Sequence, residues 1–150
     1  MKSMTTIAVL AGLTFAAGAA LAHDDAYLDT QKAPNGGQLR MAGPYHFELV
    51  LAKDSKEAKE NPIVVYVTDH AGQKIPTAGA AGTATILAGK LKSAATLKPD
   101  GDNRMKGVAR YASTADTKVV VSITLAGKQA EQARFVPLAV AKDTHTDHAH

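Results

Sequence analysis

The sequence predicts an all-β protein: a single Ig-like β-sandwich of about seven short antiparallel strands, with flexible N- and C-terminal tails. Apolar and polar residues alternate in several segments, and turn-forming residues separate these segments at regular intervals. The length of 150 residues suits one domain. With 45% hydrophobic and 21% charged residues, the composition is that of a globular protein.

Residues 1–22 have the pattern of a secretory signal peptide and not of part of the fold. A basic start is followed by an uncharged stretch over 7–22, which is short and rich in Ala and Gly for a membrane span. Its small-x-small ending predicts cleavage between Ala22 and His23. We therefore expect an exported protein, located in a bacterial periplasm, whose mature form does not span the membrane.

The mature chain divides into a polar N-terminal tail over 23–34, a β-sandwich domain over 35–138 and a His-rich C-terminal tail over 139–150. The segment 52–60 has helical composition, but a charged surface loop is the better interpretation. Period-two alternation or β-branched content predicts seven strands, at 45–51, 63–68, 83–87, 91–97, 104–111, 119–125 and 129–136.

Turn chemistry supports these boundaries. Asp69-His70-Ala71-Gly72 ends the second predicted strand, and Pro99-Asp100-Gly101-Asp102-Asn103 joins the fourth to the fifth. Ala126-Gly127-Lys128 joins the last two strands in the same way. In the first strand, one face carries Phe47, Leu49 and Leu51, and the other carries His46, Glu48 and Val50.

The composition also excludes several classes of function. Without Cys there is no disulfide framework, thiolate metal site or thiol catalysis. The formal charge of +3, from 17 basic and 14 acidic residues, is too balanced to indicate a nucleic-acid partner. The chain has no nucleophile elbow, zinc-protease helix, phosphate loop or dinucleotide fingerprint. We expect neither an enzyme nor an organic cofactor.

Histidine is the informative residue type. His145, Asp147, His148 and His150 lie together at the C-terminus, where a flexible tail can wrap imidazole nitrogens around one ion. The alternative is a solvated tail without a bound metal. The metal that this set would bind is a divalent transition ion, with Cu or Zn favoured.

Four other residues are candidate ligands. Cleavage would give His23 a free α-amine, which together with its own imidazole forms a bidentate copper chelate; the alternative is a disordered polar N-terminus. His46 and Glu48 share one face of a strand, and His70 follows another strand. Each alone is more often a surface or turn residue, but if these three converge they form a preorganised metal site.

Three segments also carry a resemblance, namely 33–38, 43–50 and 67–73. They resemble small periplasmic proteins associated with heavy-metal resistance, and the N-terminal β-domain of the periplasmic adaptor subunits of RND-type metal-efflux pumps. Asn35 stands where those relatives often have His. The adaptors continue into helical, lipoyl and barrel domains that this sequence lacks, so the resemblance implies a stand-alone accessory protein.

Two functions are therefore predicted. The first is a metal-binding accessory protein, a periplasmic buffer or chaperone for Cu, Zn, Ni or Co ions that is linked to efflux or resistance, with an efflux adaptor or other envelope protein as a partner. The alternative is a metal-independent β-sandwich module that docks on an envelope or efflux complex.

Overall fold

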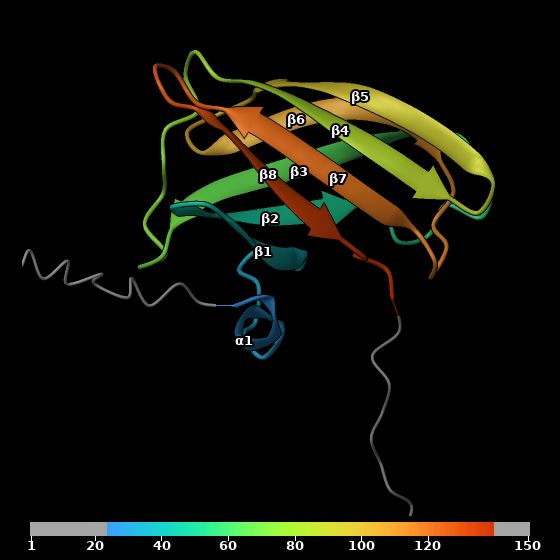
Figure 1. Ribbon diagram of the computed structural model, residues 1–150. Coiled ribbons are helices and arrows are strands. Elements are labelled where there is room, and N and C mark those ends of the chain that lie inside the picture. Colours follow the sequence, from blue (N-terminus) through green and yellow to red (C-terminus); the bar gives the residue numbers. More distant parts are fainter. Residues whose placement is uncertain (1–23, 140–150) are drawn as a thin grey trace, which may run out of the picture.

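The computed structural model describes residues 24–139 and has an all-β architecture, as predicted (Figure 1). Its eight strands form one antiparallel sheet in the order β1-β2-β3-β6-β5-β4-β7-β8. The elements of the described chain are α1 (Asp25–Asp29), β1 (Gln38–Ala42), β2 (Tyr45–Leu51), β3 (Lys59–Asp69), β4 (Ala81–Ala88), β5 (Leu91–Pro99), β6 (Arg104–Tyr111), β7 (Lys118–Thr124) and β8 (Ala130–Phe135).

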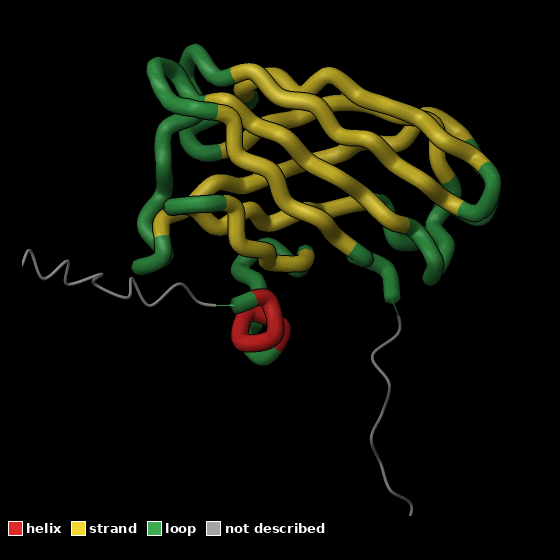
Figure 2. Tube along the Cα trace, in the orientation of Figure 1, coloured by secondary structure: helices red, strands yellow, loops and turns green. Residues whose placement is uncertain are grey.

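The sheet curls until its two edge strands meet. β1 contacts β8, and just beyond β8 the Val136 backbone N–H donates to Gln38 Oε1 at 2.8 Å. The strands therefore enclose a nearly closed, barrel-like core, with the short helix α1 outside it (Figure 2). At Gly107 in β6, a Cβ atom would collide with the backbone oxygen of Thr96, so glycine permits the close approach of β5.

All seven predicted strands are present, as β2 to β8, but the seven-stranded Ig-like sandwich is not confirmed. The pairs Lys98↔Lys106 and Pro99↔Met105 join β5 to β6, which makes one continuous sheet out of the two expected layers. The eighth strand, β1, was not predicted. It is short, and its Arg40 occupies a buried position where the sequence pattern calls for an apolar side chain.

Alternation along the strands builds the core. Phe47, Met105 and Phe135 are all buried. The largest buried side chain is Tyr111, whose hydroxyl donates to Pro62 O at 2.6 Å and accepts from Ala52 N at 2.9 Å. The predicted surface loop is present between β2 and β3, and it ends where β3 begins at Lys59.

The N-terminal segment differs from the predicted polar tail. Residues 24–34 contain α1, which begins after the N-cap Asp24 and packs on the sheet through Leu28, only 3% exposed. Arg40 Nη1 binds Asp29 Oδ1 at 2.6 Å and ties the helix to β1. Between residues 24 and 139, no helix has the length and apolar character needed to cross a membrane. The predicted signal peptide over 1–22 lies outside the described residues, as does the C-terminal tail from 140 on.

Candidate functional site

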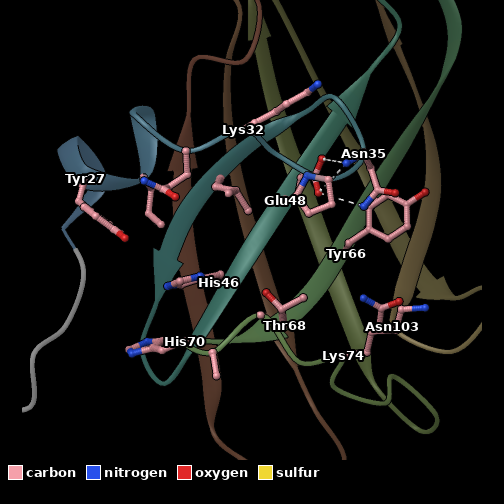
Figure 3. Close-up of a pocket in the computed structure, with 16 residues that line it drawn as sticks. Tyr27, Lys32, Asn35, His46, Glu48, Tyr66, Thr68, His70, Lys74 and Asn103 are labelled. Carbon is pink, nitrogen blue, oxygen red and sulfur yellow. Dashed lines mark hydrogen bonds between the residues drawn. The ribbon is translucent and has the colours of Figure 1, made fainter.

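A cavity of about 390 Å³ lies between the N-terminal segment and the outer face of the sheet at β1, β2 and β3 (Figure 3). The N-terminal segment contributes Tyr27, Leu28 and Asn35 to its wall. This cover explains why polar side chains on the outward face of β2 are buried. The strands and the turn after β3 contribute Leu39, His46, Glu48, Tyr66, Thr68 and His70.

His46 is held from both sides by the sheet. It is paired in register with Met41 of β1 and with Thr68 of β3, so its backbone sits in the middle of three strands. Neighbours along a strand point to opposite faces, which places Phe47 in the core and His46 in the cavity. The side chain is only 7% exposed, and its Nε2 atom is shielded from solvent.

His70 reaches the same cavity from the turn that follows β3. That turn is ordered by Asp69, whose Oδ1 accepts the backbone N–H groups of Ala71 and Gln73, each at 2.9 Å. Gly72 adopts a φ of 79°, which a residue with a side chain rarely does. The loop is therefore built to place His70 beside β2.

The two imidazoles stack. Their ring centroids are 4.8 Å apart and their planes differ by 20° (Figure 3). His70 Nε2 also lies 3.2 Å from the backbone oxygen of Gly43, in the turn between β1 and β2. Because a carbonyl oxygen only accepts, this contact puts the proton of the neutral His70 ring on Nε2 and the lone pair on Nδ1. The structure thus brings His46 and His70 together.

Glu48 lines the cavity, but its carboxylate binds backbone N–H groups and is not directed at the two histidines. Its oxygens accept from the backbone N–H groups of Asn35 and Gly37, both at 2.9 Å, and from Asn35 Nδ2 at 3.0 Å. Both carboxylate oxygens are therefore occupied in holding the turn before β1. Gly37 is needed there, since a Cβ atom would collide with the backbone of Leu49. Glu48 positions the cover of the cavity, with its carboxylate turned to the backbone of that cover.

Positive charges lie at the margin of the cavity. Lys32 and Lys74 line it and are exposed, and Figure 3 shows the Lys32 amine directed away from the two histidines. On the neighbouring strand β6, a hydrogen bond with Tyr66 and the charge of Asp100 raise the pKa of Arg104 above its ordinary value.

The remaining predicted ligands cannot be placed, because His23, His145, Asp147, His148 and His150 lie outside the described residues. Among residues 24–139, no group of three or more His, Cys, Asp or Glu side chains is arranged to hold a metal ion. The described chain therefore supplies two imidazoles at this site, short of a complete ligand set.

Several residues of the site were not singled out from the sequence. Asn35 was noted only as a substitute for a histidine, yet it is the principal partner of the Glu48 carboxylate. Nothing in the sequence marks Tyr27 or Tyr66 as a cavity residue, because a single tyrosine in a polar segment or a strand is equally common on an ordinary protein surface. The sequence clue that was available is Leu28, an isolated apolar residue in a polar segment, which indicates a contact with the sheet.

No family model matches this chain, and neither a curated protein nor a solved structure matches it significantly.

Proposed function

We propose that this protein binds a divalent transition metal ion, of the Cu or Zn type, at His46 and His70. In this proposal it is an exported accessory protein that buffers the ion or delivers it to a metal-efflux or resistance system. The observation that carries the proposal is the stacked imidazole pair, 4.8 Å between centroids, inside a cavity with polar walls.

The chemistry of the pair suits a metal ion of this class. Neutral imidazole is a common ligand of Cu and Zn, and metal–nitrogen bonds of about 2.0–2.1 Å are compatible with one ion between two neighbouring rings once their torsions adjust. Histidine ligands usually donate their second ring N–H to a carbonyl or carboxylate, which fixes the tautomer. His70 makes such a contact through Nε2 to Gly43 O.

The position of the pair favours binding over a purely structural role. The backbone of His46 is fixed by two neighbouring strands and that of His70 by the ordered Asp69 turn, so only the side-chain torsions have to change when an ion binds. The nearby carboxylate of Glu48 accepts hydrogen bonds from the backbone N–H groups of Asn35 and Gly37, and so holds the segment that lines the cavity.

The test is calorimetric titration of Zn(II) and Cu(II) into the chain that begins at His23. To silence the C-terminal tail, all forms carry His145→Ala, His148→Ala and His150→Ala. We expect one ion per chain, and a loss of affinity of at least about tenfold for His46→Ala and for His70→Ala. Thr68→Ala, which alters the same cavity wall without removing an imidazole, is the matched control and retains the affinity.

Two results contradict the proposal. If silencing the tail abolishes binding, the ion belongs to the C-terminal histidines. If neither the silenced nor the unaltered chain binds an ion, the metal-independent docking module is the better account. Thermal unfolding of each variant shows whether a loss of binding reflects loss of the fold.

A further inference from the structure

We propose that the outer face of β4 to β8, together with the turn between β4 and β5, is a docking surface for a membrane that contains anionic lipid. This surface lies on the other side of the barrel from the cavity, because the cavity is built on β1, β2 and β3. It involves neither His46 nor His70. We call the outward-pointing residues of these five strands the basic face.

The burial pattern of the strands identifies the residues of the basic face. Along β4 to β8, more buried and more exposed positions alternate, so every second side chain points away from the core. Figure 1 shows β4, β5 and β6 on the side of the barrel away from α1. Six cations occupy outward positions without an ion pair to a described residue, namely Lys92, Lys98, Lys106, Arg110, Lys118 and Arg134.

Acidic side chains do not offset these charges. The outward positions of the five strands hold no Asp or Glu, and their remaining side chains are neutral apart from Arg104. Arg104 is paired with Asp100 at 2.9 Å. Glu60 in β3 is the register partner of Arg110 and marks the border of the face. The formal charge of +3 for the whole chain therefore hides a strongly basic surface.

Two lysines of the basic face lie directly opposite each other. Lys98 of β5 and Lys106 of β6 are register partners, and like charges in that arrangement destabilise a sheet. Contact with anionic headgroups would relieve the repulsion. An external anionic partner therefore explains this pair, whereas the fold gains nothing from it.

The turn between β4 and β5 adds an apolar contact to the charges. Leu87 and Leu91 flank this turn and are 43% and 37% exposed. Leu87 is in register with Lys92 on one side and with Lys118 on the other. Exposed apolar side chains beside lysines suit the headgroup region of a bilayer, where the amines stay with the phosphates. An acidic protein surface would need the cations but not the leucines, so a lipid surface is favoured.

The test is flotation of the chain from His23 to His150 with vesicles, without added metal. The vesicles are made of phosphatidylcholine alone or of phosphatidylcholine with phosphatidylglycerol. We expect binding only to the second kind, and weaker binding at about 1 M than at about 0.1 M salt, because the Debye length falls from about 10 Å to about 3 Å. Lys98→Gln with Lys106→Gln should weaken binding at least about tenfold, since each cation near an anionic surface contributes about fivefold.

Two further variants separate the apolar contact from net charge. Leu87→Ser with Leu91→Ser keeps the charge and should also weaken binding, because the apolar contact with the headgroup region is lost. Lys32→Gln with Lys74→Gln is the matched control. It removes two exposed lysines at the margin of the cavity and should leave vesicle binding close to that of the unaltered chain.

No binding to phosphatidylglycerol vesicles at low salt, or equal binding to vesicles without this lipid, would overturn the proposal. An equal loss in the control variant would mean that net charge alone is responsible. Binding to polyglutamate but not to vesicles would identify an acidic protein as the partner instead. Thermal unfolding shows whether each variant keeps its fold, and the Lys98 and Lys106 variant should be at least as stable as the unaltered chain, because a repulsion is removed.

Discussion

The role of the Glu48 carboxylate, as a metal ligand or as a hydrogen-bond acceptor, depends on the groups around it. Its position two residues from His46 on one strand face is the spacing expected of a pair of metal ligands. The structure surrounds it with three N–H donors from Asn35 and Gly37 instead. The sequence placed the residue on the correct face, but the donors come from a turn whose path the pattern does not encode.

Replacement of this acid tests its structural role. Glu48→Gln removes the charge and one acceptor, and hydrogen bonds to charged groups contribute about 1.5–3 kcal/mol. We expect a loss of that order in the free energy of unfolding measured with urea, and a weaker effect on metal affinity than His46→Ala produces. Glu57→Gln, at an exposed loop position, is the control, and an equal stability for both variants would refute the assignment.

Tyr111 gives a pH-dependent prediction. Burial raises the pKa of its hydroxyl above the ordinary value of 10.0, an effect that the hydrogen bond from Ala52 N partly offsets. The unfolded chain therefore ionises first as pH rises, so the contribution of Tyr111 to stability is present below about pH 10 and is lost above it. Tyr111→Phe should cost about 1 kcal/mol near neutral pH.

The measurement is urea unfolding of both forms at about pH 8 and about pH 11, with the ordinary tyrosine pKa lying between them. The stability advantage of the natural protein should shrink at the higher pH, because only Tyr111 differs between the two forms. An advantage that is constant with pH would show that this hydroxyl does not titrate differently in the folded state.

At the scale of elements, the strands β2 to β8 were predicted, whereas the two five-residue elements α1 and β1 were not. β1 carries Arg40 at a buried position, which is tolerated because Asp29 neutralises the guanidinium. α1 has five residues and a single buried side chain, too few for a helical period to be recognised. Both elements depend on contacts with each other, which local patterns do not contain.

The attachment of α1 can be tested directly. Leu28→Ser removes the one buried apolar side chain of the helix, at a cost of about 2 kcal/mol. We expect faster amide hydrogen exchange over residues 25–31 and unchanged exchange in the strands β3 and β7. Ala26→Ser, on the exposed side of the same helix, is the control, and similar exchange in the two variants would show that Leu28 does not hold the helix.

At the scale of the whole molecule, the sequence pattern could not predict that the sheet closes on itself. Alternation distinguishes an inner from an outer face, and this was correct along β2, where Phe47 and Leu49 are buried in the core. It does not reveal that β5 and β6 join the two halves, or that β1 meets β8. The cavity is likewise a property of the whole molecule, because its walls come from segments that lie far apart along the chain.

We expect the core to fold without any metal ion. It consists of apolar side chains on the inner face, whereas His46 and His70 lie on the outer side of the sheet. We therefore expect a chelator to leave the β signal in circular dichroism unchanged, and added metal ion to raise the melting temperature by mass action. Loss of the β signal on chelation would mean that the ion is part of the fold.

The central claim is that a metal ion binds at the stacked pair, and imidazole-ring NMR tests it most directly. The sample is the isotopically labelled chain from His23 to His150, titrated with Zn(II), which is diamagnetic and leaves every ring visible. The account predicts that the ring nitrogens of His46 and His70 shift together and reach their end point at one equivalent. Unchanged His46 and His70 signals, with shifts confined to His145, His148 and His150, would contradict it.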